Sequence, residues 1–451
     1  MLLCARYILP VSQPHIENGA VLVRDGRIAD VGYASDLKMR YPEEKTRDFG
    51  LAAIMPGFVD LHTHLEYTAL RGASPDVPYA PYKNAVDEKA MLLSRQDWDD
   101  SALLGGLEAV ASGITTVADI TSTGASAAAV NAIGLRGMIY REAETMEKAR
   151  IKRTIERADE DIHAWREAYD PQRITVGIGA NTLYRCHPDL LAAIADYGSD
   201  GTPVAVHVAC SQEESDFVRY GSSPFSVHNH ELERGYGIDM PPWLPTGVSP
   251  VRYVLNWGIL DAPNVLAIHC VHVDDEDIEM LAERDVAIAF CPRCNAKLGM
   301  GVAPVGKYLK AGLRVGLGTD SPAASDSMDM IDEMRIGMLI QRSFGDKRNF
   351  ITTNQMVRMA TLDGARALKM EDRIGSLEPG KLADVIAIDL SNSHQAPTHF
   401  PDSAIVHTAN QDNVIMTMVG GKILYENGTH KHRVDPGRVK ARAEEMRLKL
   451  R

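Results

Sequence analysis

The feature that most constrains the fold of this chain is a series of eight short apolar runs with helix-like stretches between them. Each run has the length and the apolar character of a buried strand. Eight such strands in alternation with helices are the count of a closed barrel of parallel strands. We therefore expect an α/β fold with a (β/α)8 TIM-type barrel over residues 56–370. The runs lie at 54–62, 114–119, 136–140, 174–179, 204–210, 265–271, 286–291 and 315–320.

The two ends of the chain carry a different pattern. Residues 1–55 contain short alternating segments with a hairpin signal at Asp25-Gly26. Residues 371–451 return to strand and turn chemistry after the last helices of the barrel. We expect both ends to build one small β-sandwich beside the barrel. A terminal helix with one apolar face begins at Pro436, and we expect it to pack on the molecule or to form a contact in a homo-oligomer.

Composition narrows the classes of function. The chain has 451 residues and a formal net charge of −13, from 48 Lys+Arg against 61 Asp+Glu. This balance argues against nucleic acid or an anionic membrane as a partner, because phosphate binding needs clustered cations. No apolar stretch approaches the roughly 20 residues that cross a bilayer, and the first residues do not resemble a signal peptide. Six cysteines in mostly apolar segments suit reduced thiols. We therefore expect a cytoplasmic enzyme that acts on a small molecule.

Polar residues at the ends of the apolar runs form a candidate metal site. In a barrel of this type the carboxyl ends of the strands face the active site. His62 and His64 end the first run, and the two-residue period of a strand points both side chains the same way. His207 lies in the fifth run, His269 lies in the sixth, and Asp320 closes the eighth. Such imidazoles and a carboxylate predict one divalent metal ion, Zn2+ first and Fe2+ as the alternative, with a coordination position left for water.

The sequence around these residues resembles the amidohydrolase superfamily. The resemblance is carried by Pro56-Gly-Phe-Val-Asp-Leu-His-Thr-His-Leu65 and by Leu317-Gly-Thr-Asp320. Leu266-Ala-Ile-His-Cys-Val-His-Val-Asp274, Cys291-Pro-Arg-Cys-Asn-Ala-Lys-Leu-Gly299 and Gly375-Ser-Leu-Glu-Pro-Gly-Lys-Leu-Ala-Asp384 look like the cytosine-deaminase-like branch. That branch contains deaminases of S-adenosylhomocysteine, methylthioadenosine and aminofutalosine, and also triazine hydrolases. The resemblance implies a metal-dependent hydrolase that deaminates an aminated heterocycle, an adenosine-type compound or a related purine or pyrimidine, and releases ammonia.

The resemblance also implies roles for the candidate residues. His62, His64, His207 and Asp320 would bind one metal ion, and His269 would contact the attacking water. A bound metal can lower the pKa of water from 15.7 to about 7, which supplies hydroxide at neutral pH. Asp320 would accept the proton of the water and pass it to the leaving amine, while His269 steadies the developing charge.

One position departs from the family pattern. The family usually places a glutamate three residues after the fifth-strand histidine, where it protonates the ring nitrogen, and here that residue is Cys210. A thiol with a pKa of about 8.5 can donate a proton but lacks the reach and the hydrogen-bonding capacity of a carboxyl group.

Three interpretations of Cys210 stay open. The thiol itself acts as acid or nucleophile, with its pKa lowered by the metal. In the second interpretation another carboxylate replaces the missing one. Glu66 is the first candidate because, if the strand continues, its side chain points the same way as those of His62 and His64. Glu213 and Glu214 lie further along the chain. In the third interpretation Cys210 is only a small buried residue, and the substrate needs no ring protonation or the deaminase activity is lost.

Four further residues are candidates for substrate contact. Phe290 and Asn181 stand where adenosine-type deaminases tend to have histidine, Arg71 matches the arginine of the family after the first strand, and Glu142 follows the third strand. The departures at Phe290 and Asn181 keep other reactions open: hydrolysis of another C–N or C–Cl bond, in a triazine or a cyclic amide, or binding of a small molecule without turnover. The segment 211–251 is interpreted as a long loop that forms a lid or a pocket wall.

Overall fold

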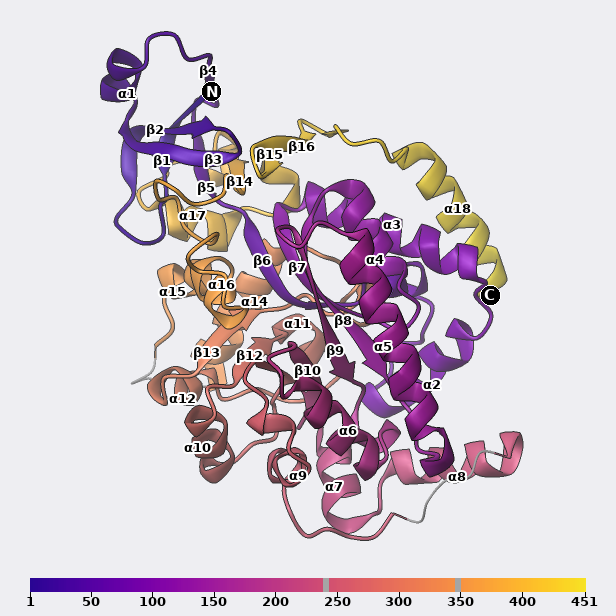
Figure 1. Ribbon diagram of the computed structural model, residues 1–451. Helices are drawn as coiled ribbons and strands as arrows, with labels where there is room; N and C mark the ends of the chain where they lie inside the picture. Colours follow the sequence, from indigo (N-terminus) through magenta and orange to yellow (C-terminus); the bar gives the residue numbers. More distant parts are fainter. Residues whose placement is uncertain (238–242, 345–349) are drawn as a thin grey trace.

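The computed structural model describes residues 1–237, 243–344 and 350–451. Eight parallel strands form one sheet in the order β13-β12-β11-β10-β9-β8-β7-β6. The two edge strands meet, and the backbone N–H of Asp320 donates to the carbonyl of His62 at 2.8 Å across the seam. This nearly closed barrel with helices around it confirms the predicted TIM-type fold (Figure 1). The strands are β6 (Phe58–Thr63), β7 (Ile114–Thr121), β8 (Arg136–Ala143), β9 (Ile174–Ala180), β10 (Val204–Val208), β11 (Val265–His269), β12 (Ala287–Phe290) and β13 (Arg314–Leu317).

Every residue of β7 and every residue of β10 is buried. The sequences of these strands therefore do not alternate between apolar and polar residues. Capping boxes start several of the surrounding helices, among them α3 with Ser94 and α10 with Asp274. The described helices of the barrel are α2 (Tyr79–Ala90), α3 (Arg95–Ala111), α4 (Ala125–Ile133), α5 (Ile151–Ala168), α6 (Pro188–Gly198), α7 (Gln212–Tyr220), α8 (Pro224–Tyr236), α9 (Pro250–Asn256), α10 (Asp275–Glu283), α11 (Pro292–Lys297), α12 (Val305–Lys310), α13 (Pro322–Ser325), α14 (Met330–Phe344), α15 (Thr353–Met359) and α16 (Leu362–Ala367), with short 3-10 turns such as η1 (Leu65–Leu70) and η3 (Leu183–Arg185).

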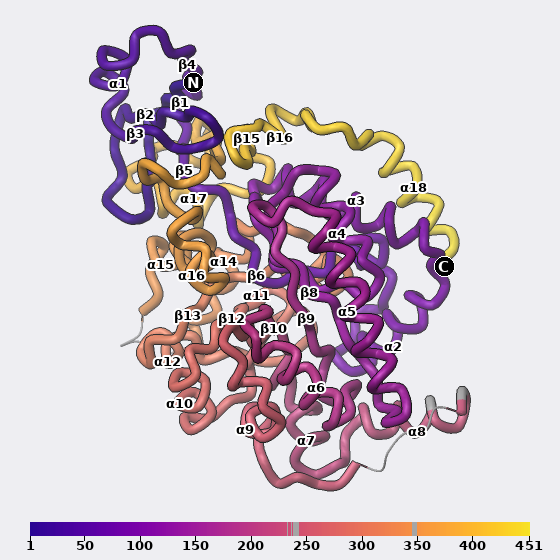
Figure 2. The backbone as a smooth tube through the Cα atoms, in the orientation of Figure 1, coloured from indigo at the N-terminus to yellow at the C-terminus, as the bar shows by residue number. Residues whose placement is uncertain are grey.

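Strands from both ends of the chain form a second, nine-stranded sheet in the order β17-β16-β15-β14-β5-β1-β2-β3, with β4 beside β1. The junction of the two ends is the antiparallel pair of β5 and β14. Figure 2 shows the indigo and the yellow parts of the chain meeting in this sheet, as the sequence predicted. The exact boundaries at residues 55 and 370 stay a prediction. The elements are β1 (Leu2–Ile8), β2 (Ile16–Arg24), β3 (Arg27–Tyr33), α1 (Ala34–Arg40), β4 (Thr46–Asp48), β5 (Ala52–Pro56), β14 (Val385–Asp389), α17 (Pro401–Thr408), β15 (Val414–Val419), β16 (Lys422–Glu426) and β17 (Thr429–His430).

The first apolar run is two strands rather than one. β5 belongs to the end sheet, whereas β6 belongs to the barrel, and Gly57 lies between them. A Cβ atom at Gly57 would lie 2.1 Å from Cγ2 of Thr115, so only glycine fits where the chain crosses from one sheet to the other.

The segment 211–251 is not the long loop that was expected. It contains α7, α8 and the start of α9. The predicted lid falls partly on residues 238–242, which lie outside the described residues, and none of the described residues of this segment lines the active-site cavity.

The terminal helix α18 (Pro436–Lys449) packs on α3 (Figure 1). Arg442 pairs with Asp97 at 3.1 Å and with Asp100 at 3.0 Å, and Lys449 pairs with Asp97 at 2.6 Å. Both aspartates are fully buried beneath α18. The helix therefore packs on its own chain, while the homo-oligomer contact stays a prediction. Among the described helices, we find none with the length and apolar character of a membrane span.

Candidate metal centre and active-site cavity

The predicted metal-binding residues converge at one end of the barrel. His62 and His64 lie at the end of β6, His207 on β10, and His269 at the end of β11, and Asp320 follows β13. The ring centroids of His62 and His64 are 4.8 Å apart, and those of His62 and His207 are 4.9 Å apart. Possible ligand atoms of His62, His64 and Asp320 all lie within 4.8 Å of one another, as do those of His62, His207 and His269.

The chemistry of this cluster fits a divalent metal ion. Neither ring nitrogen of His62, nor Nδ1 of His207, has a hydrogen-bond partner among the described residues, although these atoms are buried. Unpaired buried polar atoms are costly, so several of them within one cluster of possible ligand atoms indicate a missing ligand rather than a packed core. Burial lowers the pKa of His64 to about 3 and that of His269 to about 4. Both rings are therefore neutral, which is the form in which imidazole binds metal.

Asp320 supplies the negative charge of the cluster. Burial works to raise the pKa of this carboxyl group, but the adjacent His62 ring and the other neighbouring imidazoles outweigh it and hold the pKa well below its usual range. Oδ1 of Asp320 lies 3.5 Å from Nε2 of His62, and Oδ2 lies 3.8 Å from Nε2 of His269. An ionised carboxylate among neutral imidazoles is the donor set that the sequence predicted.

Contacts behind the cluster fix the direction of its side chains. Nδ1 of His64 lies 3.0 Å from the carbonyl of Ile120, and Nδ1 of His269 lies 3.0 Å from Oδ1 of Asn295. Such partners orient the ring and leave Nε2 facing the site. The backbone of His269 has φ of 71° and that of Asp320 has φ of 59°, a region that residues with a Cβ atom rarely adopt. Strained backbone at two of the strand ends is typical of a functional site.

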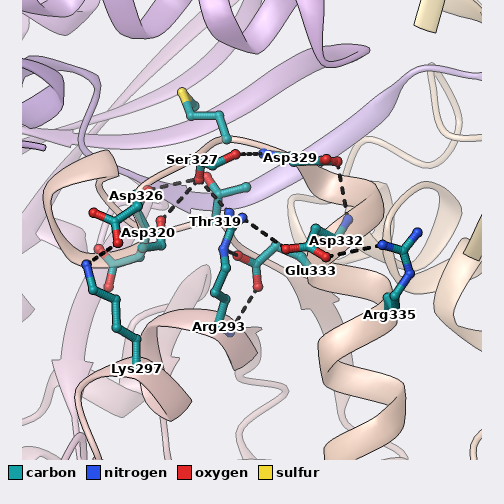
Figure 3. A network of polar contacts seen from close by, with 12 residues as sticks. Arg293, Lys297, Thr319, Asp320, Asp326, Ser327, Asp329, Asp332, Glu333 and Arg335 are labelled. Atoms are coloured by element: carbon teal, nitrogen blue, oxygen red, sulfur yellow. Dashed lines mark hydrogen bonds and ion pairs between the residues drawn. The ribbon is translucent and has the colours of Figure 1, made fainter. Parts of the chain in front are cut away.

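A second network anchors the helix that carries Asn295. The backbone N–H of Arg293 donates to Glu333 at 3.1 Å, and Nε of Arg293 lies 2.9 Å from the same carboxylate. Figure 3 shows these contacts beside Asp320, where they join α11 to α14. Burial raises the pKa of Glu333 to about 8, and the nearby Arg293 opposes that rise. The network lies behind the metal cluster and holds the partner of His269 in place.

A cavity opens above the metal cluster. Four of the predicted metal-centre residues line it, namely His64, His207, His269 and Asp320, while His62 lies beneath them. The other lining residues are Tyr67, Tyr79, Tyr82, Lys83, Val86, Glu142, Asn181, Thr182, Cys294, Leu298, Ser321 and Ala324.

Two of the four predicted substrate residues line this cavity. Glu142 is at the end of β8 and Asn181 directly follows β9, and Nδ2 of Asn181 donates to Glu144 at 2.6 Å. Arg71 is not among the lining residues and forms an ion pair with Glu108. Phe290, at the end of β12, is buried beside Gly337 of α14 and is not among the lining residues.

Glu66 does not occupy the place that the strand parity predicted. β6 ends at Thr63 and the chain turns into η1, so the alternation of strand side chains does not reach this residue. Its carboxylate is buried and accepts hydrogen bonds from Thr121 Oγ1 at 2.5 Å, Thr123 Oγ1 at 2.5 Å, Ser122 N at 2.9 Å and Ser122 Oγ at 3.0 Å. Glu66 is not among the described residues that line the cavity.

Cys210 is fully buried and also stands outside the cavity lining. Burial raises the pKa of its thiol well above the usual range, and the neighbouring Glu214 raises it further. One oxygen of Glu214 accepts a hydrogen bond from the backbone N–H of Ala209 at 2.9 Å, and burial raises the pKa of this carboxyl group to about 7. The pKa-lowering environment that a reactive thiol requires is therefore not present among the protein groups around Cys210.

The sequence interpretation missed the wall that α2 contributes. Tyr79, Tyr82, Lys83 and Val86 lie on one face of this helix and all line the cavity. Their spacing of three and four residues is the signal of a shared helical face. Asn295 was missed as well, because its role depends on a contact with His269 that only the fold creates.

Comparison with known proteins identifies the family. The chain matches the amidohydrolase family over residues 53–424 and belongs to it. A 5-methylthioadenosine/S-adenosylhomocysteine deaminase of Moorella thermoacetica is 33% identical over 429 residues, 94% of each chain. A protein of the same name from Symbiobacterium thermophilum is 32% identical over 422 residues, 91% of this chain and 89% of that one.

Solved structures share the fold. An adenosine deaminase of Xanthomonas campestris with bound zinc has a TM-score of 0.85 and 24% identity, covering 100% of this chain and 98% of that one. An atrazine chlorohydrolase of Arthrobacter aurescens TC1 complexed with zinc has a TM-score of 0.82 and 23% identity, covering 99% of each chain. The family and the relatives confirm the prediction of an amidohydrolase, a metal-dependent hydrolase of carbon–nitrogen bonds with the features of a hydrolytic deaminase.

Proposed function

We propose that the chain is a zinc-dependent deaminase of a modified adenosine, related in substrate to the methylthioadenosine and S-adenosylhomocysteine deaminases that it resembles. The reaction replaces the amino group of the purine ring by an oxo group and releases ammonia. The observation that carries the proposal is the cluster of His62, His64, His207, His269 and Asp320 beside the cavity, in which nitrogens of His62 and His207 have no partner among the described residues. We further propose the cytoplasm as the site of the reaction.

His62, His64, His207 and Asp320 would hold the metal ion, which when bound makes water acidic enough to supply hydroxide at neutral pH. His269 positions the attacking water. Because Asn295 presents Oδ1 to Nδ1 of His269, the ring proton lies on Nδ1 and Nε2 is left as an acceptor facing Asp320. Asp320 accepts the proton of the water and returns it to the leaving amine.

The aromatic wall suits a flat heterocycle. Tyr67, Tyr79 and Tyr82 line the cavity, and the hydroxyls of Tyr79 and Tyr184 lie 3.0 Å apart. Burial raises the pKa of Tyr79 and of Tyr82 well above the usual range, so both phenols stay neutral. Neutral rings with fixed hydroxyl groups offer apolar surface to a purine and hydrogen bonds to its edge. Asn181 and Glu142 are among the polar residues of the cavity lining that could contact the heterocycle.

The test is ammonia release by the zinc-loaded protein from a panel of adenosine, methylthioadenosine, S-adenosylhomocysteine, a pterin and a chlorotriazine. We expect ammonia and the ultraviolet change of an amino-to-oxo conversion with at least one adenosine-type compound. Removal of metal by a chelator should abolish the rate, and added Zn2+ should restore it. Chloride release from the triazine alone, or no turnover of any compound by metal-loaded protein, would reject the proposal.

A further inference from the structure

The deaminase reaction needs a proton donor for the ring nitrogen, and three candidate groups are badly placed to be that donor. The thiol of Cys210 is buried outside the cavity lining, and the carboxylate of Glu214 lies behind it, bonded to the backbone of Ala209. Glu66 already accepts four hydrogen bonds from the turn after β7. A group that protonates substrate must reach it within hydrogen-bond distance, directly or through one water. The donor should therefore be sought among the groups that line the cavity.

Glu142 meets this requirement. Among the described residues that line the cavity, Glu142 and Asp320 are the carboxylic acids, and Asp320 belongs to the metal cluster. The side chain of Glu142 comes from β8 and shares the cavity with His64 and His207. It is 8% exposed, and no described residue donates a hydrogen bond to its carboxyl oxygens. A buried carboxyl group without a partner in the protein is free to bind a ligand, and it is costly to keep ionised.

The charges around Glu142 favour its protonated form. Burial and, after it, the like charges of Glu144 and Glu66 raise the pKa of Glu142 to about 8, against the opposing charges of Lys83 and Arg141. The groups that face it from other elements also include Tyr67 on η1, Cys186 after η3 and Arg157 on α5, which lines a second cavity together with Glu142. Tyr67 and Cys186 have raised pKa values of their own and stay neutral. At neutral pH most molecules therefore carry a proton on Glu142, available for donation.

We propose that Glu142 protonates the ring nitrogen of the substrate, the task that the family assigns to the glutamate replaced here by Cys210. This inference rests on the proposed deaminase function. As the oxygen of water bonds to the ring carbon, Asp320 takes one proton of the water and Glu142 gives its proton to the adjacent ring nitrogen. When the C–N bond breaks, Asp320 returns its proton to the amine, which leaves as ammonia. Glu142 then recovers a proton from the new hydroxyl group as the C=O bond forms.

The central experiment compares the wild type with Glu142→Gln on methylthioadenosine and on adenosine, both proteins loaded with zinc. Glutamine keeps the shape of the side chain but cannot give up a proton at neutral pH, so kcat should fall about 10²–10⁴-fold, the usual contribution of acid catalysis. The zinc content and the unfolding temperature should stay close to those of the wild type. A kcat within threefold of the wild type would overturn the assignment.

The pH profile gives a readout that a purely structural role would not produce. A group with a raised pKa is protonated below that value and loses its proton as the pH rises through it, so wild-type kcat should fall above pH about 8. The residual activity of Glu142→Gln should lack this alkaline limb. An unchanged limb in the variant would reject Glu142 as its source.

Two neighbours should move the alkaline limb in opposite directions. Glu144→Gln removes a like charge and should shift it to lower pH, whereas Lys83→Met removes a cation and should shift it to higher pH. If both variants kept the wild-type limb, the proposal would be wrong. Inertness of the metal-loaded wild type on every compound would instead reject the deaminase function itself, so the two failures are distinguishable.

Discussion

The two halves of the active-site cavity are built in different ways. The metal half, which holds the proposed metal ligands and His269, consists of residues at strand ends. Hydrogen-bond contacts fix these side chains to the barrel or its helices: His64 contacts the carbonyl of Ile120, and His269 contacts Asn295. The substrate half includes a helix face on α2, Glu142 at the end of β8 and Asn181 after β9, and Asn181 donates a hydrogen bond to Glu144. Metal geometry tolerates little displacement, and strand ends provide that precision. Between related enzymes, the side chains on such a helix can differ according to the substrate while the metal centre stays the same.

The largest expected effect is the loss of a metal-half residue. Asp320→Asn removes the charge of the cluster and the group that accepts the proton of water, so kcat/KM should fall by about 10⁴-fold or more. Elemental analysis should show reduced zinc. Full activity with full metal content in this variant would show that the metal half is wrongly assigned.

A smaller effect should follow when only the support of the metal half is removed. Asn295→Ala leaves every proposed metal ligand in place but frees the ring of His269, and loss of such a partner typically costs about 10–100-fold in activity or metal affinity. We expect the loss in kcat, measured at saturating zinc. Asn354→Ala, at an exposed position of α15, is a matched control that should behave as wild type. Equal behaviour of the two variants would contradict a positioning role for Asn295.

The smallest expected effect concerns the substrate half. Asn181→Ala removes one polar contact to the cavity and its bond to Glu144. The loss of a hydrogen bond of about 1.4 kcal/mol corresponds to a tenfold change, which should appear in KM with kcat and zinc content nearly unchanged. A variant that lost zinc would show that the two halves are not separable.

The sequence predicted the metal half better than the substrate half, for a physical reason. Strand residues have a period of two and barrel strand ends share one face, so His62, His64, His207, His269 and Asp320 could be grouped without a structure. The substrate half depends on how loops and helices fold over the barrel.

Individual residues show where strand periodicity and family pattern stop predicting position. Glu66 was placed by extending the strand period past Thr63, where the chain had already turned into η1. Arg71 followed the family pattern, but it pairs with Glu108 outside the cavity lining. Lys83 carried no signal that distinguished it from a surface lysine on an ordinary helix. Its place in the cavity follows from the position of α2, which tertiary packing decides.

The shared sheet of the two chain ends has a consequence for biosynthesis. A ribosome releases β1, β2, β3 and β5 first, but β14, which pairs with β5 on the side away from β1, emerges more than three hundred residues later. During that interval one edge of β5 is unpaired, and unpaired strand edges favour misassembly. We expect the barrel strands to pair before the end sheet closes, since their neighbours in the sheet are also neighbours along the chain. The late strand β14 is therefore the one that joins β15, β16 and β17 to the sheet begun by β1, β2, β3 and β5.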